Sequence, residues 1–248
     1  MRTKTEKSVT LYVVIFTCML LTMLHLVTAS IERISQTADS LRIGAPVIVI
    51  DAGHGGEDGG AEANGVLEKD INLQIAQILE VLLRTNGFDV LMLREEDIDL
   101  GDDTLETVRE RKVSDLKRRA ELVKEAGNCI LISIHQNYFE EPQYSGAQAF
   151  FSPQNPKSEL LGDFIQTAVK GHLQANNKRE IKPGANIWLL EHVSVPAVLV
   201  ECGFLSNSEE AVLLSTKEYQ QQIALCIFGG VCDYLHTENE ETWRRIFG

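Results

Sequence analysis

The sequence predicts an α/β fold: a single domain built on a central, mostly parallel twisted sheet with helices on both faces. Apolar runs of strand length alternate along the chain with helical patterns, which is the order that such sheets require. A chain of 248 residues that is 44% hydrophobic can also bury one sizeable core. The strand-like runs cover residues 46–51, 88–93, 129–134, 146–151, 186–190 and 197–201, and the helical patterns cover about 69–86, 114–126, 157–176 and 217–235.

The amino-terminal residues 1–31 differ from the rest of the chain. Three basic residues precede an uncharged, apolar stretch that is long enough to cross a bilayer. We expect a signal peptide or membrane anchor that exports everything behind it, then a linker at 32–44, a catalytic domain at 45–236 and a polar tail at 237–248. Cleavage stays open, because VTAS offers a signal-peptidase position while the length of the apolar core slightly favours a retained anchor.

The charge of the exported part excludes one class of partner. Without residues 1–29 the chain keeps 20 basic and 35 acidic residues, a net charge of −15. Such a surface repels phosphate backbones, so we expect no nucleic-acid partner. The five cysteines form no CxxC pair, and we interpret them as mostly buried small side chains.

The first predicted strand, 46–51, breaks into a glycine-rich loop that carries His54, in the stretch VIVIDAGHGGEDGG. Glycines permit backbone turns that other residues disfavour. The helix that follows has one apolar stripe and ends at the stop signal Asn86-Gly87. The stripe consists of Ile71, Ile75, Ile78, Leu79 and Leu82.

The later elements repeat these patterns. The acidic segment 95–106 separates the second strand from the second helix, and we interpret it as a solvated loop, with a partner-binding loop as the alternative. The helix at 157–176 has apolar residues at helical spacing. They are Leu161, Ile165, Ala168, Val169 and Leu173.

Three predicted strands lead to side chains that can bind a metal or transfer a proton. The strand PVIVID ends in Asp51 and runs into His54. CILISI is followed by His135, and PAVLV is followed by Glu201. Ligands gather at the carboxyl ends of strands in such sheets. Each histidine alone has a simpler explanation as a loop or strand-end residue, but their convergence on one edge predicts a functional site.

These residues suit a zinc site. Zinc takes histidine nitrogens and glutamate oxygens, and catalytic sites use three protein ligands with a fourth position for water. Glu68, at the start of the first helix, would complete a set with His54 and His135, although a carboxylate there also complements the helix dipole. Glu57 is a competing ligand that spacing alone does not exclude. Glu201 then remains as a free carboxylate beside the metal.

Three assignments near this site stay open at the level of sequence. Asp51 either orients a metal-bound imidazole or caps the glycine loop. Glu201 has a structural alternative, a carboxylate paired with a basic neighbour such as Arg119. Cys202 as a nucleophile is the weaker interpretation, because it follows Glu201 directly and nothing marks it as a thiolate.

Four blocks, DAGHGGEDGG, EKDINL, SIHQN and VPAVLVECGFLSN, resemble in order the signature blocks of the zinc-dependent N-acetylmuramoyl-L-alanine amidases of the type 3 family. The resemblance spans residues 46–235. It implies one zinc per chain, bound by His54, Glu68 and His135, with Glu201 acting on the water. It also implies hydrolysis of the amide bond between N-acetylmuramic acid and L-alanine in peptidoglycan.

Further stretches, among them LREEDIDLGDD and IWLLEHVSVPAVL, resemble the germination-specific subgroup of spore-forming bacteria. This implies removal of peptide stems from the spore cortex, toward muramic-δ-lactam, outside the cytoplasmic membrane. An activating spore lipoprotein, as in clostridial relatives, is then a candidate partner. Gln136, Tyr138 and Glu180 depart from the common pattern of the broader family, which bears on the substrate groove.

Two other classes of function stay in view. A non-catalytic peptidoglycan-binding module with the same fold would need a lost catalytic residue, although all four are present. A nucleotide-dependent enzyme could use GHGGEDGG as a phosphate cradle, but the loop lacks both the G-x-G-x-x-G spacing and the P-loop lysine.

Overall fold

The computed structural model describes residues 19, 21–23, 28 and 45–247. By its contacts the chain divides into two units, Met1–Ala45 and Pro46–Gly248. The expected signal peptide or anchor and the expected linker lie, apart from a few residues, outside the described part. Among the described residues, no helix is both long enough and apolar enough to cross a membrane.

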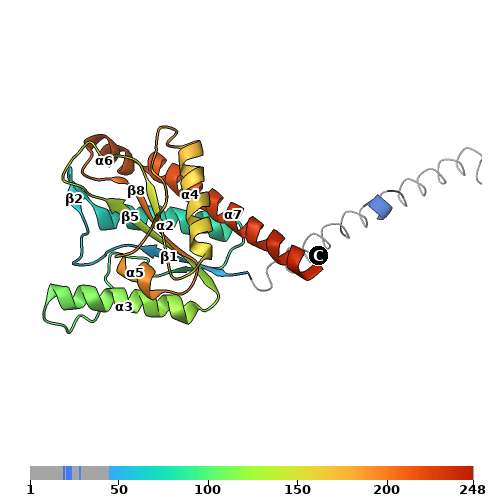
Figure 1. The fold of residues 1–248 in the computed structure, drawn as a ribbon, viewed down its shortest axis with the longest axis horizontal. Helices are drawn as coiled ribbons and strands as arrows, with labels where there is room; N and C mark the ends of the chain where they lie inside the picture. Colours follow the sequence, from blue (N-terminus) through green and yellow to red (C-terminus); the bar gives the residue numbers. More distant parts are fainter. Residues whose placement is uncertain (1–18, 20, 24–27, 29–44, 248) are drawn as a thin grey trace, which may run out of the picture. The chain divides into compact units, whose positions relative to one another are not determined.

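A six-stranded sheet forms the centre of the second unit, in the order β4-β1-β5-β8-β6-β7. Its first four strands are parallel: β4 (Val90–Met92), β1 (Val47–Ala52), β5 (Cys129–Asn137) and β8 (Ala197–Phe204). β6 (Gln148–Phe151) is antiparallel to β8, and β7 (Lys182–Pro183) is parallel to β6 at the edge. The predicted α/β class with a mostly parallel sheet is confirmed (Figure 1).

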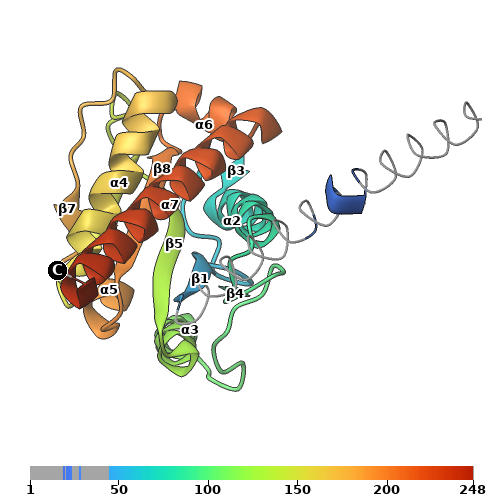
Figure 2. The ribbon, with the colours of Figure 1, turned by 90° about the vertical axis from the view of Figure 1, so that its right-hand side faces the viewer.

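Helices cover both faces of this sheet (Figure 2). One face packs against α2 (Glu68–Thr85), α4 (Lys157–His172) and α7 (Lys217–Phe247). The other packs against α3 (Val108–Ala126) and the short α5 (Trp188–His192). A further helix, α6 (Ser208–Leu214), follows β8.

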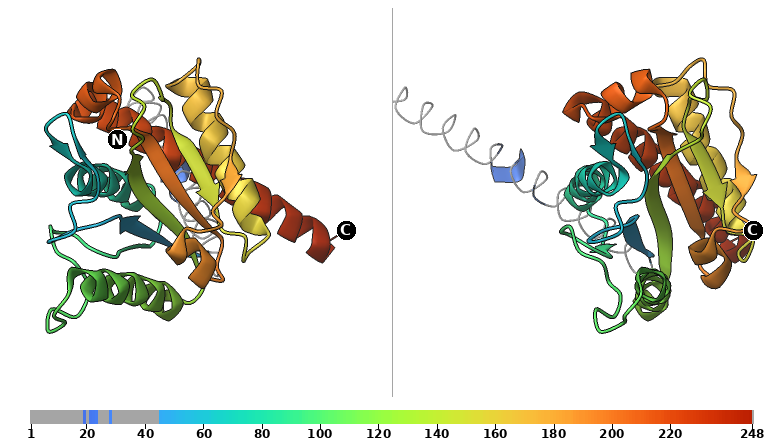
Figure 3. Two further views of the ribbon diagram at one scale, coloured as in Figure 1. Left: turned by 60° about the vertical axis from the view of Figure 1, so that its left-hand side comes forward. Right: turned by 90° about the vertical axis from the view of Figure 1, so that its left-hand side faces the viewer.

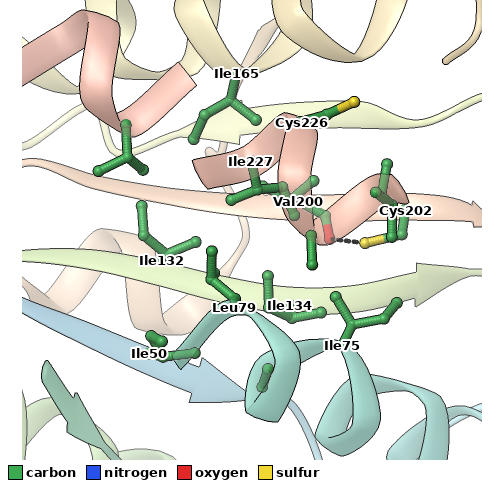
Figure 4. Close-up of a cluster of buried hydrophobic side chains, with 14 of the residues drawn as sticks. Ile50, Ile75, Leu79, Ile132, Ile134, Ile165, Val200, Cys202, Cys226 and Ile227 are labelled. Atoms are coloured by element: carbon green, nitrogen blue, oxygen red, sulfur yellow. Dashed lines mark hydrogen bonds between the residues drawn. The ribbon is translucent and has the colours of Figure 1, made fainter. Parts of the chain in front are cut away.

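Alternation along the strands decides which side chains enter the larger core. Ile50, Ile132 and Val200 point toward the α2 and α7 layer, where they pack with residues such as Leu79 and Ile227 (Figure 4). Successive strand residues point to opposite faces, so the residues beside them point toward α3. That second set includes Asp51, Ser133, His135 and Glu201.

The predicted strand at 186–190 is wrong, because this segment leads into helix α5. Short apolar runs do not distinguish a buried strand from a buried helical turn. Leu189 and Leu190 are both buried here, although they are adjacent in sequence. A single helical turn buries both side chains against the α3 side of the sheet.

Several further elements differ from the prediction. β7 and α6 were not predicted, and α7 continues through the predicted polar tail to Phe247. Helix α3 begins at Val108 rather than near 114, because Thr107 and Glu110 form a reciprocal capping box. The unpredicted β2 (Glu62–Ala63) and β3 (Val66–Leu67) form a hairpin. Its turn, Asn64-Gly65, has positive φ at both residues, as the tight turns of such hairpins require.

Candidate metal centre

His54, Glu68 and His135 lie together at the carboxyl edge of the sheet. Their ligand atoms are all within 4.8 Å of one another. Glu68 Oε2 is 3.1 Å from His54 Nε2, and Glu68 Oε1 is 2.9 Å from His135 Nδ1. β1 and β5, which lie side by side in Figure 3, bring the two histidines together, and α2 begins at Glu68. The fold therefore gathers the three residues that the sequence singled out.

The donor set and its spacing fit a zinc ion. Zinc binds nitrogen and oxygen ligands at about 2.0–2.1 Å, so the ligand atoms of a tetrahedral site lie about 3.3 Å apart. The observed nitrogen–oxygen separations are close to that value. Glu57 lies outside the group, because its side chain is 68% exposed and forms an ion pair with Arg111. The structure thus places Glu68, rather than Glu57, beside both histidines.

Glycines make room for the ligand side chains. A Cβ atom on Gly53 would lie 2.2 Å from two atoms of the His135 ring. A Cβ atom on Gly60 would lie 2.5 Å from Glu68 Oε2, and Gly60 also has a φ of 69°. The glycine-rich loop therefore lets its backbone approach the ligands more closely than any other residue type permits.

The Glu68 carboxylate is held firmly in place. It is 4% exposed and accepts hydrogen bonds from the backbone N–H groups of Ala61 (2.9 Å) and Gln136 (3.1 Å). Asn72 donates a further bond of 3.3 Å. Burial alone would raise the pKa of Glu68, but the hydrogen bonds and charges of His135 and His54 outweigh it and hold the pKa well below its usual range. The side chain is therefore ionised, as a metal ligand must be.

Asp58, which the sequence interpretation missed, holds the other side of His54. Its Oδ2 is 2.9 Å from His54 Nδ1, and its Oδ1 is 2.7 Å from Lys112 Nζ. Metal-binding histidines usually direct their second nitrogen to such an acceptor. Burial lowers the pKa of His54, but Asp58 and Glu68 outweigh it and raise the pKa to about 9. The sequence signal that could have identified Asp58 is its position four residues after His54.

The raised pKa of His54 predicts that zinc binding releases a proton. At pH 7 the ring is protonated in the metal-free protein, and the ion can bind only after this proton leaves. We expect release of about one proton per zinc, and a roughly tenfold loss of apparent affinity for each pH unit below 9. Calorimetry in buffers of different ionisation enthalpy measures both. Binding without proton release at pH 7 would contradict this expectation, and Asp58→Asn should reduce the release.

Arg119, in helix α3, binds the loop that carries His54. Its guanidinium is 2% exposed and pairs with Asp51 and Asp115. It also donates to the carbonyl oxygens of Ala52 (3.0 Å) and His54 (2.8 Å). His54 has a φ of 62°, which is unfavourable for residues other than glycine. These bonds stabilise that conformation.

The side chain of Asp51 contacts Arg119 and Ser133. Besides Arg119, it accepts a hydrogen bond of 2.6 Å from Ser133 Oγ. The carboxylate beside the His54 imidazole is therefore Asp58 rather than Asp51. Arg119, considered as a partner for Glu201, pairs instead with Asp51 and Asp115.

Part of the acidic segment 95–106 contacts the glycine-rich loop that carries His54, so the segment is not fully solvated. Asp97 accepts a hydrogen bond of 2.9 Å from the Gly56 N–H and pairs with Lys69 at 2.7 Å. Lys69 in turn donates to the Gly56 carbonyl oxygen. The glycine loop is thus fixed from the segment before α3 as well as from α3 itself.

Glu201 lies beside His54, Glu68 and His135. β8 pairs with β5 so that Glu201 is opposite His135. Its Oε2 is buried and has no hydrogen-bond partner among the described residues. Burial raises the pKa of Glu201 to about 7, with a further contribution from Glu68, although His135 and His54 lower it. Buried polar atoms are rarely left unpaired, so this oxygen is available to a water or a substrate.

Cys202 points away from this group. It is fully buried and packs in the core on the α2 side of the sheet (Figure 4). Burial raises the pKa of its thiol. The interpretation of Cys202 as a buried small side chain is confirmed.

A family model described as N-acetylmuramoyl-L-alanine amidase (Amidase_3) matches residues 48–233. The chain belongs to this amidase family. Family membership assigns it a peptidoglycan amidase activity, which is a hydrolase activity. The fold and the order of the site residues agree with that assignment.

Individual amidases resemble the chain over most of their length. A germination-specific N-acetylmuramoyl-L-alanine amidase of Bacillus subtilis is 36% identical, covering 79% of this chain and 82% of that protein. AmiA of Escherichia coli is 30% identical, and the match covers 78% of this chain and 77% of AmiA. Among solved structures, the CwlD amidase from Clostridioides difficile in complex with the GerS lipoprotein has a TM-score of 0.76 and 39% identity. The match covers 78% of this chain and 100% of that one.

Proposed function

We propose that this amidase depends on zinc and removes peptide stems from spore-cortex peptidoglycan, a step toward muramic-δ-lactam during germination. The observation that carries the proposal is the group of His54, Glu68 and His135 with Glu201 beside it, whose Oε2 has no hydrogen-bond partner among the described residues. The similarity to a germination-specific amidase supports the spore assignment.

The residues divide the chemistry between them. His54, Glu68 and His135 would hold one zinc ion, which polarises the scissile carbonyl and lowers the pKa of a bound water. Glu201 accepts a proton from the attacking water and donates it to the nitrogen as the C–N bond breaks, giving a carboxylic acid and an amine. Asp58 keeps the Nε2 of His54 directed toward Glu68. Burial makes Glu201 a stronger base than an exposed glutamate.

We also propose a location and a protein partner for the enzyme. Its substrate lies outside the cytoplasmic membrane, and the apolar amino-terminal segment is the proposed export signal or anchor. The complex of the C. difficile CwlD amidase with the GerS lipoprotein supports a spore lipoprotein as a partner. No nucleic-acid partner is proposed, given the net charge of −13.

The deciding experiment measures metal content and activity on the same preparation. We expect about one zinc per chain by elemental analysis and zinc-dependent release of peptide stems from purified spore peptidoglycan. A chain that takes up no zinc at saturating concentration would overturn the His54–Glu68–His135 site. A chain that is loaded with zinc and supplied with a lipoprotein partner, yet releases no stems from any peptidoglycan, would favour the non-catalytic binding module.

A further inference from the structure

Arg94 lies just beyond β4, the parallel strand that pairs with β1 (Figure 2). In this pairing Met92 is opposite Ile50. Two residues farther along both strands, the same register places Arg94 beside Ala52, at the carboxyl edge where β1 leads to His54. The arginine therefore lies at the edge of the sheet that carries the metal group, and the sequence interpretation assigned it no role.

The guanidinium of Arg94 is 2% exposed, and its hydrogen bonds to the described residues all end on backbone carbonyl oxygens. Its Nε donates to Ala52 (2.7 Å), and its Nη1 donates to Glu96 (3.0 Å). Its Nη2 donates to both Gly53 (3.0 Å) and Lys69 (2.9 Å). Most of the N–H groups that a guanidinium offers are thus used on the backbone.

Arg94 forms no ion pair with any residue that the structure describes, which is unusual for a buried charge. The carboxylates whose charges act on it are Asp51, Asp97 and Asp115. Each of these is paired with another basic side chain, either Lys69 or Arg119. A charge that is buried without its own carboxylate indicates that the directed bonds of the guanidinium are what this position requires.

The two carbonyl groups that share Nη2 belong to the two segments that carry His54 and Glu68. Gly53 immediately precedes His54, and Lys69 immediately follows Glu68. A guanidinium is planar and directs its N–H groups rigidly, so this bridge fixes the end of β1 relative to the first turn of α2. The separation of 3.1 Å between His54 Nε2 and Glu68 Oε2 depends on how far apart those two backbones lie.

The segment after Arg94 joins the same two parts of the chain a second time. Arg94 bonds to the carbonyl oxygen of Glu96, and the next residue, Asp97, accepts a hydrogen bond from the Gly56 N–H and pairs with Lys69. The side chain of Asp97 is 50% exposed, whereas Arg94 is buried. The glycine loop and the start of α2 are thus connected from the interior by Arg94 and from the surface by Asp97.

We propose that Arg94 is a positioning residue for the metal centre, which fixes the distance between the backbone that carries His54 and the backbone that carries Glu68. It acts only through those backbones and contacts neither the metal nor the substrate. Without the bridge the two ligands separate, and the ion binds less tightly. This inference rests on the proposed function, because it takes zinc as the ion that these ligands bind.

Zinc affinity of the full chain, measured by chelator competition, tests the proposal. We expect Arg94→Gln to weaken zinc binding by about 10- to 100-fold. Arg94→Lys should weaken it by roughly tenfold, because a compact ammonium keeps the charge but lacks the planar fork. The matched control is Arg84→Gln, which removes a bond of 2.8 Å from another arginine to a backbone carbonyl, that of Val90, at the far end of α2. It should change the affinity by less than about twofold.

A second measurement separates positioning from a general contribution to stability. Cobalt(II) bound in place of zinc has visible absorption bands that report the geometry of its ligands. We expect both Arg94 variants to change this spectrum and Arg84→Gln to leave it unchanged. Thermal unfolding of the metal-free proteins records any loss of stability by itself. An arginine with only a structural role would lower the unfolding temperature but leave the zinc affinity and the cobalt spectrum of the folded protein as in the wild type.

A folded Arg94→Gln protein with wild-type zinc affinity would overturn the proposal. A higher affinity would also overturn it, since the main effect of Arg94 would then be repulsion between its charge and the ion. If the glutamine variant does not fold, Arg94→Lys decides, and wild-type affinity with an unchanged cobalt spectrum in that variant would refute the positioning role.

The failures of this inference and of the proposed function are distinguishable, because metal affinity needs no turnover. A chain whose zinc affinity depends on Arg94 but which hydrolyses no peptidoglycan would refute only the proposed function. Zinc-dependent release of peptide stems by an enzyme whose zinc affinity does not depend on Arg94 would refute only the positioning role.

Discussion

Replacing Glu201 with glutamine should lower kcat by roughly 10²- to 10⁴-fold while zinc content stays at the wild-type level. The amide has nearly the same shape as the carboxylate but cannot accept the proton of the attacking water. No described residue donates a hydrogen bond to Glu201 Oε2, so the substitution breaks no contact that supports the fold. Stem release measured together with elemental analysis tests this prediction.

Glu57→Gln is the matched control for this variant. Glu57 is an exposed carboxylate on the glycine loop, outside the metal group, and its amide variant should keep near-wild-type activity. A Glu201→Gln enzyme with near-wild-type turnover would remove Glu201 from the mechanism. Loss of zinc in that variant would instead show that Glu201 supports the metal site.

Replacing Gly53 with alanine should weaken zinc binding by about 10- to 100-fold. The new methyl group would lie 2.2 Å from the imidazole of His135, so the ring must leave its position. The backbone at Gly53 has little room to yield, because its carbonyl oxygen accepts hydrogen bonds from Asn72 (3.1 Å) and Arg94 (3.0 Å). Chelator competition measures the affinity.

Gly171→Ala is the control for the glycine prediction. Gly171 lies in helix α4, and a Cβ atom there would meet no atom within 4 Å. This variant should bind zinc normally and unfold at the same temperature as the wild type or a slightly higher one. Thermal unfolding of Gly53→Ala separates a local loss of His135 from a failure to fold. A folded Gly53→Ala protein with wild-type zinc affinity would refute the steric argument.

The positions of His54 and His135 after two predicted strands were enough to predict that they converge, whereas spacing left Glu57 and Glu68 both open and only the family resemblance favoured Glu68. A parallel sheet carries such positions to one edge, whatever the details of the loops. The alternation of strand residues also determined the face, since His135 and Glu201 point away from the buried isoleucines of β5 and valines of β8. The fold class followed from a different pattern, the alternation of strand-like and helical segments along the chain.

The surroundings of the site were beyond prediction from sequence. Asp58 and Arg119 act through contacts with α3 and the His54 loop, and these depend on where α3 packs rather than on local spacing. The segment at 186–190 was misassigned because a short apolar run fits either a strand or a helical turn. The stacking of Trp188 on His192 depends on that helical turn, because residues four apart in a helix lie on the same side of it.

The parallel pairing of β1 with β5 has a consequence for when the proposed zinc ion would bind. His54 and His135 meet only when these strands pair, and the segment that contains α2, β4 and α3 lies between the two strands in the sequence. An unfolded chain does not hold these side chains together, so the complete group exists only in the folded protein. Metal uptake would therefore mark the completion of the sheet. A chain whose β1 and β5 fail to pair would remain metal-free even where zinc is abundant.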